Sequence, residues 1–257
     1  AFVPTSISGL EAANPMAGYT TVAPPEANNM GTANITYPIH VPAGRQGVEP
    51  HPQLVYNSNG GNSVCGVGWD LPVQCISVET RWGVPLYDSM KETETYLLNG
   101  EQLLTRYDQK PAFARPYDNR MNGDVRFYPR VEGAFDSIIR HGTRPENYWW
   151  EVFDRNGMQY IYGDNNESRL RSQRARGVAK WYISKIIDRN GNTIQYKYFT
   201  YRRKEGGRNS GIRVYLDRIL YTLPNGGSVD SSWYGYCVSF YYGSGRPDPV
   251  ITGNYGA

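Results

Sequence analysis

Residues 150–163 read WEVFDRNGMQYIYG, and residues 181–198 read WYISKIIDRNGNTIQYKY. Each stretch is an apolar run that begins with Trp, followed by Asp-Arg-Asn-Gly and then by alternating residues that end in tyrosines. Asn-Gly between two segments of period two is a strong hairpin signal, because both residues tolerate the positive φ of a tight turn. The Asp that opens each turn can accept hydrogen bonds from backbone amides two residues on. We therefore predict two β-hairpins with aromatic faces, which are structural repeats rather than catalytic loops.

The composition favours an all-β protein. The chain has 257 residues, with 22 Tyr, 28 Gly and 17 Pro, a mixture that suits pleated aromatic surfaces joined by many turns. A mean hydropathy of −0.60 and the lack of an apolar run of about 18 residues exclude a membrane-spanning helix. The formal net charge of +3 is too small to indicate a polyanionic partner by itself, so we expect no nucleic-acid partner.

The pattern along the chain predicts a lead-in followed by a β-domain. Residues 1–30 lack sustained periodicity and are expected to be extended or poorly ordered, whereas residues 31–257 form the β-domain. A change of composition near 140–147 suggests a subdivision there. Apolar residues do not recur at helical spacing over three turns, so the fold is an antiparallel β-hairpin array or curved sheet with few short helices. Longer loops are predicted at 105–124 and 164–180, and strands at 35–39, 53–57, 73–79, 95–104, 125–131, 148–153, 158–162, 181–187, 192–201, 213–222 and 236–242.

Further short motifs are spread over residues 31–250. They are GTA at 31–33, YPI at 37–39, VPAGR at 41–45, PQLVYNS at 52–58, GGN at 60–62, GVGWDL at 66–71, YLLNGEQL at 96–103 and YYGSGRPD at 241–248. With the two hairpins, these motifs resemble the SpvB-type N-terminal domain of Tc insecticidal toxin B components and of the SpvB virulence protein. The hairpins alone also resemble the YD repeats of Rhs proteins and teneurins.

The resemblance implies a non-catalytic structural module of an exported toxin-like or Rhs-like protein, a scaffold or shell segment for a partner or toxic polypeptide. It implies that any ADP-ribosyltransferase activity belongs to a separate domain, so we expect this chain not to be an enzyme and to need no cofactor. The expected partners are other segments of the same long polypeptide or a toxin component. The expected localisation is secreted or at the cell surface, and the chain shows no export signal.

The alternative function is a cell-surface carbohydrate-binding module. In that case exposed aromatic rings would stack on sugars, and the first candidates would be Trp149, Trp150, Trp181 and Trp233.

One pair of acidic residues resembles a catalytic motif. Glu92-Thr93-Glu94 has the Glu-x-Glu spacing that ADP-ribosyltransferases use to orient the nicotinamide ribose. The matching Arg and Ser-Thr-Ser segments are missing upstream, so we predict that Glu92 and Glu94 are structural.

The remaining candidate chemistry is weak, and we predict no catalytic, cofactor-binding or metal site. The three histidines do not form a metal-type cluster, and the two Asp-Arg-Asn-Gly turns carry too few oxygen ligands for calcium. The three cysteines are expected to be free or buried thiols, with a Cys65–Cys75 bridge as the alternative. The basic residues near Tyr196 are expected on a solvated loop at the tip of a strand pair, with single-stranded nucleic acid as the alternative. The residues are His40, His51 and His141, Cys65, Cys75 and Cys237, and Arg202, Arg203, Lys204, Arg208 and Arg213.

Overall fold

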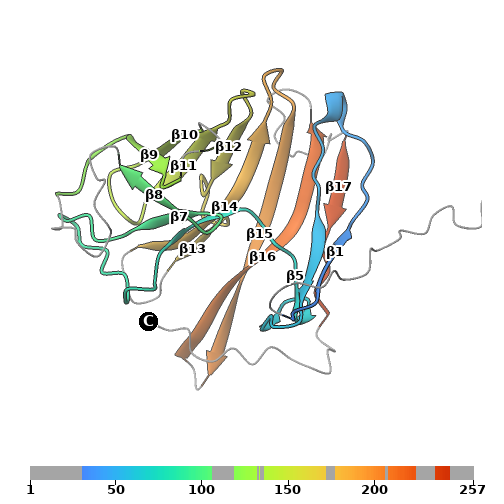
Figure 1. The fold of residues 1–257 in the computed structure, drawn as a ribbon, viewed down its shortest axis with the longest axis horizontal. Coiled ribbons are helices and arrows are strands. Elements are labelled where there is room, and N and C mark those ends of the chain that lie inside the picture. The colour runs from blue at the N-terminus through green and yellow to red at the C-terminus, as the bar shows by residue number, and fades with distance from the viewer. Residues whose placement is uncertain are drawn as a thin grey trace, which may run out of the picture.

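The computed structural model describes residues 31–105, 119–131, 133, 136–171, 177–205, 208–223 and 235–243, and these form an almost entirely β structure (Figure 1). The first strands are β1 (Asn34–Pro38), β2 (Gln53–Asn57), β3 (Asn62–Ser63), β4 (Gly66–Val67), β5 (Trp69–Asp70), β6 (Cys75–Val78), β7 (Tyr96–Leu98), β8 (Glu101–Thr105) and β9 (Val125–Pro129). The later strands are β10 (Ser137–His141), β11 (Trp149–Phe153), β12 (Gln159–Tyr162), β13 (Arg169–Arg171), β14 (Val178–Ile187), β15 (Thr193–Glu205), β16 (Arg208–Leu223) and β17 (Tyr236–Ser239). Within the described ranges, the helical structure is one short 3₁₀ turn, η2 (Arg45–Gly47). The expected all-β, antiparallel fold class is confirmed.

The main sheet closes on itself along part of its width. Strands β6 to β12 follow one another as antiparallel neighbours, and β14 pairs with both β6 and β12. Residues 180–182 of β14 make the β6 pairing, and residues 183–187 make the β12 pairing. We call the closed set of β6–β12 and β14 the strand ring.

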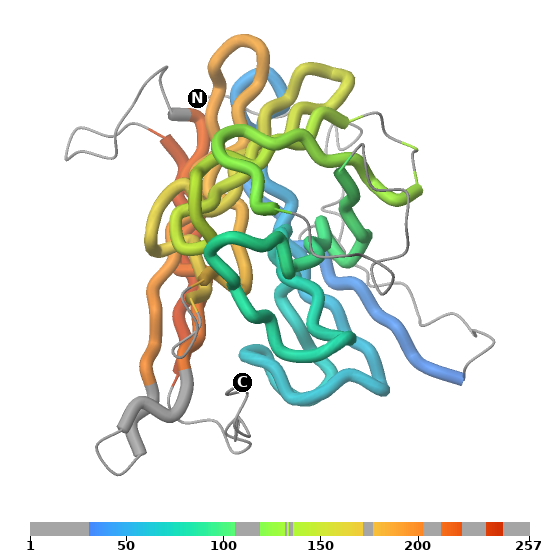
Figure 2. The backbone as a smooth tube through the Cα atoms, turned by 90° about the vertical axis from the view of Figure 1, so that its left-hand side faces the viewer, coloured from blue at the N-terminus to red at the C-terminus, as the bar shows by residue number. Residues whose placement is uncertain are grey.

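The same sheet stays open on its other side. Beyond β14 it continues through β15 and β16 to β17, and these three strands form the open extension. Figure 2 shows the long β15–β16 hairpin, in orange, running the height of the molecule beside the green and yellow strands of the ring. One long strand, β14, therefore belongs to both the ring and the base of the extension.

Large aromatic side chains fill the interior of the strand ring. Tyr96, Phe127, Trp150 and Trp181 meet edge to face, with ring centroids 4.9–5.9 Å apart. Each is at most 3% exposed, and the aliphatic side chains of the neighbouring strands surround them. Such aromatic pairs stabilise by about 0.5–1.5 kcal/mol beyond their buried area.

The N-terminal segment covers one face of the open extension. Strands β1, β2 and β5 form a small antiparallel sheet, and the segment between β1 and β2 packs on the face of β15 and β16. Between them lies a second core around Ile194, Leu216 and Ile219, against which Val41 and Val48 pack.

Both Asp-Arg-Asn-Gly hairpins are present, in β11–β12 and β14–β15. Their turns use positive φ only at the glycines, Gly157 (φ 78°) and Gly191 (φ 81°), and not at the preceding asparagines. The aspartates complete the turns as expected, because the Asp154 carboxylate accepts from the Met158 amide at 2.9 Å. The hairpin prediction was correct, but the conformation assumed for the asparagines was wrong.

The predicted strand at 95–104 is wrong, because the chain turns within it. Asn99 (φ 49°) and Gly100 (φ 93°) both take positive φ and join β7 to β8. This Asn-Gly pair has the backbone conformation that the sequence reasoning had assigned to the other two turns.

Other boundaries also differ from the expectation. Strand β13 and the start of β14 lie in the predicted loop at 164–180, and β10 was missed. The last predicted strand ends at Ser239 rather than at 242, and β16 is longer than the predicted 213–222. The lead-in at 1–30 lies outside the described residues. The subdivision near 140–147 falls on β10 and the turn after it, and the domain division stays a prediction.

None of the helical structure in the described residues is long and apolar enough to cross a membrane.

Two glycines with similar backbone allow a test of packing inside the ring. Gly163 (φ +66°) and Gly123 (φ +82°) are both left-handed, but only a Cβ on Gly163 would overlap the buried Trp181 indole. We expect Gly123→Ala to cost about 1 kcal/mol of unfolding free energy through backbone strain. Gly163→Ala should cost about 1–3 kcal/mol more through overpacking. Urea denaturation measures both, and equal losses would contradict the packing assignment.

Candidate functional site

Two glutamates and two arginines lie inside the strand ring, and they include the acidic pair singled out in the sequence. Arg140, on β10, is completely buried, and the Arg120 side chain is 2% exposed. The side chain of Glu94 is 0% exposed and that of Glu92 is 11% exposed. We call these four residues the ionic cluster. Its formal charges balance, which a buried set of ions requires.

Glu92 joins the two arginines. Arg140 donates from Nη1 and Nη2 to the two carboxylate oxygens of Glu92, at 2.9 and 3.0 Å. Arg120 donates from Nη1 to Oε1 of Glu92 at 3.0 Å, and the Tyr96 hydroxyl donates to the same oxygen at 2.9 Å. This two-pronged geometry is the strong form of an arginine–carboxylate pair.

Arg120 and Glu94 fix the segment between β6 and β7. Arg120 donates from Nη2 to Glu94 Oε2 at 2.7 Å and to the Lys91 backbone oxygen at 2.8 Å, and from Nε to the Asp88 backbone oxygen at 2.8 Å. Glu94 in turn accepts from the backbone amide of Tyr87 at 2.6 Å. Both glutamates are therefore paired with arginines inside the ring.

Aromatic rings surround the Arg140 guanidinium. Its Cζ lies 4.0 Å from the centroid of the Tyr148 ring, 5.3 Å from that of Phe127 and 5.5 Å from that of Tyr96. Burial opposes the charge, but Tyr96 and Glu92 outweigh it and raise the pKa of Arg140. Burial also raises the pKa of Tyr96 well above its ordinary value, so its hydroxyl keeps the proton that it donates to Glu92. The cluster is a tightly bonded part of the core and not a free acid–base pair.

Two of the four tryptophans proposed for sugar stacking are core residues. Trp150 is 0% and Trp181 is 1% exposed, and the indole of Trp181 donates to the Tyr148 backbone oxygen at 2.6 Å. The expectation that these two rings are exposed is therefore wrong. Trp149 is half-buried and stacked on His141, with ring centroids 4.1 Å apart. Trp233 lies outside the described residues.

The histidines are dispersed. His40 and His51 are exposed in the N-terminal segment. His141 lies between two carboxylates, with Nδ1 2.8 Å from Asp124 and Nε2 3.3 Å from Glu151. Within the part of the chain that the structure describes, no group of three or more His, Cys, Asp or Glu side chains is arranged to hold a metal ion.

None of the three cysteines forms a disulfide, and the Cys65–Cys75 bridge considered as the alternative is absent. Cys75 is half-buried on β6, and burial raises its pKa, partly offset by Lys180.

The second Asp-Arg-Asn-Gly turn is bonded to the N-terminal segment. Gln46 Oε1 accepts from the side-chain amides of Asn190 and Asn192, both at 2.9 Å. Asp188 Oδ1 accepts from the backbone amides of the same two residues, at 2.8 and 2.7 Å. The turn oxygens are occupied by the turn itself, as expected for a plain structural turn.

An aromatic patch lies on the β15–β16 hairpin and includes Tyr242, which follows β17. Phe199 and Tyr215 stack with centroids 5.2 Å apart, and Tyr242 meets both rings edge-on. Phe199 is 40% and Tyr201 is 55% exposed. We call these four residues the hairpin patch.

The basic residues of this region lie within the paired strands β15 and β16, which extend to Glu205 and from Arg208. The prediction of a strand pair is correct, but its basic residues stand on the strands rather than on a long tip loop.

A ring with a neutralised interior and an open extension describes a structural β-module. Residues 27–214 match the family model described as Salmonella virulence plasmid 65kDa B protein, SpvB. The match covers most of the chain, so the chain belongs to the SpvB family.

Relatives of this chain include virulence and toxin proteins. It is 28% identical over 209 residues to mono(ADP-ribosyl)transferase SpvB of Salmonella typhimurium, an alignment that covers 74% of this chain and 35% of that protein. The chain therefore spans about a third of that relative.

Solved structures show the same fold. The N-terminal domain of effector protein SpvB from Salmonella typhimurium strain LT2 has a TM-score of 0.67 at 24% identity, covering 87% of this chain and 77% of that one. TcdB2-TccC3 has a TM-score of 0.63 at 25% identity, covering 79% of this chain and 10% of that one. The Tc holotoxin pore of Photorhabdus luminescens gives 0.60 at 25% identity, covering the same two shares. The chain is thus an SpvB N-terminal-type module related to Tc toxin components, as the sequence motifs implied.

Removal of one carboxylate from the ionic cluster should lower the free energy of unfolding. Glu94→Ala leaves the Arg120 guanidinium buried without its closest carboxylate, and we expect a loss of about 3–5 kcal/mol of unfolding free energy. Glu101→Ala removes an exposed carboxylate and should cost about 0.5 kcal/mol or less. The double variant Glu94→Leu/Arg120→Met should recover part of the loss. Urea denaturation measures all three, and a loss below about 1 kcal/mol for Glu94→Ala would refute the assignment.

Asp188 should make the stability of the second turn depend on pH. Burial opposes its charge, but hydrogen bonds from Asn192 and Asn190 outweigh it and lower the pKa of Asp188. The stabilisation is therefore complete above the unfolded pKa of about 3.9 and is lost as the pH falls through the lower folded value. Wild type should exceed Asp188→Asn in stability at pH 7, and the difference should shrink at pH 3. A difference independent of pH, measured by guanidinium denaturation, would rule this out.

Proposed function

We propose that this chain is a non-catalytic structural module of an exported toxin-like protein, and that it acts as a scaffold or shell segment for another polypeptide. The occupant is another segment of the same polypeptide or a toxin component. The observation that carries the proposal is the contrast between two parts of one sheet. The strand ring is closed and filled with side chains, whereas the extension is open and bears the hairpin patch.

The closed side offers little chemistry to a substrate. Both glutamates that resemble a catalytic pair are bonded to buried arginines, and large aromatic rings fill the remaining interior. A catalytic carboxylate must reach its substrate, and these two lie inside a packed core. Their placement supports the structural assignment of the pair.

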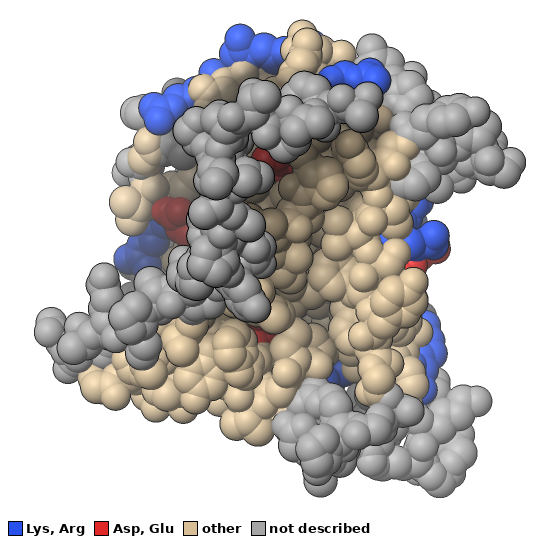
Figure 3. Space-filling model, turned by 90° about the vertical axis from the view of Figure 1, so that its right-hand side faces the viewer, with Lys and Arg blue, Asp and Glu red and all other residues tan. Residues whose placement is uncertain are grey.

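The open side offers surface for docking. An exposed sheet edge and exposed aromatic rings are features that proteins bury against a partner. Strand β17 is the last strand of the extension among the described residues, and Tyr241 just beyond it is 93% exposed. Figure 3 shows that the right-hand side of the molecule is hollowed and largely uncharged, with a few acidic side chains in and around the hollow and Lys and Arg gathered at its margin.

The relatives support a role within a larger assembly. The aligned part of TcdB2-TccC3 is 10% of that chain, and the aligned part of the Salmonella transferase is 35% of that protein. The module is thus a small part of each relative. We place the ADP-ribosyltransferase activity named for the latter outside the matched region, and we place this chain outside the producing cell with its toxin and effector relatives.

The hairpin patch gives the test. Phe199→Ser/Tyr201→Ser in the full native protein should reduce recovery of the associated toxin polypeptide at least tenfold in affinity purification, because two exposed aromatic anchors are lost. Val67→Ser, which changes a 60% exposed residue on β4, is the control and should have no effect.

Two outcomes would overturn the proposal. One is unchanged assembly in the hairpin variant, provided that its melting temperature matches wild type. The other is NAD cleavage by this chain that Glu94→Gln abolishes in a variant that still folds.

A further inference from the structure

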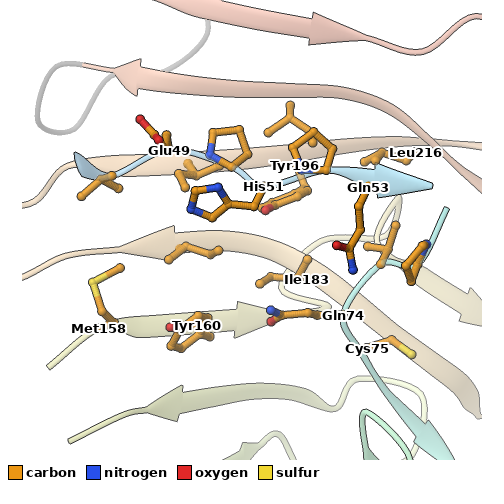
Figure 4. A pocket seen from close by; sticks show the side chains of 18 of the residues that line it. Glu49, His51, Gln53, Gln74, Cys75, Met158, Tyr160, Ile183, Tyr196 and Leu216 are labelled. Carbon is orange, nitrogen blue, oxygen red and sulfur yellow. The ribbon is translucent and has the colours of Figure 1, made fainter. Parts of the chain in front are cut away.

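A cavity of about 870 Å³ lies between the N-terminal segment and the main sheet. Residues 46–53, which we call the strap, form one wall, and the opposite wall comes from β12, β14, β15 and β16 (Figure 4). Its floor is apolar, made by Ile183, Ile186, Ile194, Tyr196, Leu216 and Ile219. This volume and lining fall within the range of binding pockets.

The polar groups of the cavity are unevenly placed. Figure 4 shows Glu49 and Met158 at one end and Gln53 and Gln74 toward the other. Asp188 belongs to the Met158 end, because the two Asp-Arg-Asn-Gly turns are in contact. The cavity therefore has an acidic end and an amide end.

The charges of the lining have one sign. Its charged side chains are the carboxylates of Glu49 and Asp188, and none of the described lining residues is Lys or Arg. The chain as a whole carries a formal charge of +3, so this acidic end opposes the overall charge. Complementarity favours an occupant with a cationic group at that end.

The amide end distinguishes between kinds of occupant. Gln53 extends from the strap toward the segment before β6, which carries Gln74, and Gln74 Oε1 accepts from the Tyr162 hydroxyl at 3.2 Å (Figure 4). Both side chains are exposed to water. The backbone of an extended polypeptide replaces that water with hydrogen bonds, whereas an alkyl chain covers the amides without pairing them, at a cost. The apolar floor then accommodates alternate side chains of such a segment.

We propose that the cavity beneath the strap binds an extended, apolar polypeptide segment whose cationic side chain lies at the Glu49–Asp188 end. This inference rests on the proposed scaffold function and names the site and chemistry of the partner segment. Gln46 holds the strap over the cavity through its bonds to Asn190 and Asn192. The ordered strap is thus a preformed wall of the site.

The test uses acetylated, amidated hexapeptides titrated into the chain by calorimetry. We expect KIVLTV to bind at least about fivefold more tightly than EIVLTV, because one surface charge interaction is reversed. Dodecylamine, which is cationic and apolar but lacks amides, should bind at least about fivefold more weakly than KIVLTV. Equal affinities for the two peptides, or no binding at millimolar concentration, would overturn the proposal. Tighter binding of dodecylamine would assign the cavity to amphiphiles instead.

Single substitutions test whether the peptide binds in the cavity beneath the strap. Gln74→Trp fills the cavity from an exposed position and should abolish KIVLTV binding, whereas Gln102→Trp, on β8, should not. Glu49→Gln should remove the preference for KIVLTV over EIVLTV, whereas Glu167→Gln, an exposed position outside the cavity, should preserve it. Unchanged binding in Gln74→Trp would refute the site. Circular dichroism verifies the fold of each variant.

Failure of this inference can be told from failure of the scaffold function. Absence of peptide binding, together with loss of assembly in the Phe199→Ser/Tyr201→Ser protein, leaves the scaffold function standing and removes the cavity as its docking site.

Discussion

The pair formed by Arg140 and Glu92 is the constraint around which the strand ring is arranged. Arg140 is completely buried, and an unpaired buried charge costs several kcal/mol, so the ring must bring a carboxylate to it. Glu92 lies 48 positions earlier, between β6 and β7. Its bonds to Arg140 and Arg120 tie this connection to β10 and to the segment before β9. The ionic cluster therefore links these parts of the ring through directional hydrogen bonds.

Strand β14 carries that rigidity from the closed side to the open side. Its pairings with β6 and β12 complete the ring, and its end also pairs with β15. The buried Trp181 and Ile183 on this strand anchor it in the ring core. The open extension therefore projects from a fixed base, which suits a surface that holds another polypeptide in place.

Local patterns revealed the hairpins but not the interior of the ring. Asp-Arg-Asn-Gly turns are written in consecutive residues, so the sequence predicted β11–β12 and β14–β15. The sequence did not predict strand β10, because Arg140 and His141 at its end are polar residues of the kind found in loops. Nothing local shows that Arg140 points inward, since its partner Glu92 is far away in sequence. Likewise, Trp150 and Trp181 carry no local sign that distinguishes a core ring from a sugar-stacking ring.

The carboxylates inside the ring and those beneath the strap have different partners. Inside the ring, each carboxylate of the ionic cluster is matched by an arginine, so the interior has no charge left to offer a partner. Beneath the strap, Glu49 and Asp188 accept hydrogen bonds from uncharged amide groups, so their negative charges are held in place but not neutralised. Charges fixed in this way at the end of an apolar cavity favour a cationic, apolar polypeptide segment. The recognition that we propose therefore belongs to the cavity beneath the strap and to the open extension, and the closed interior of the ring supplies the rigidity.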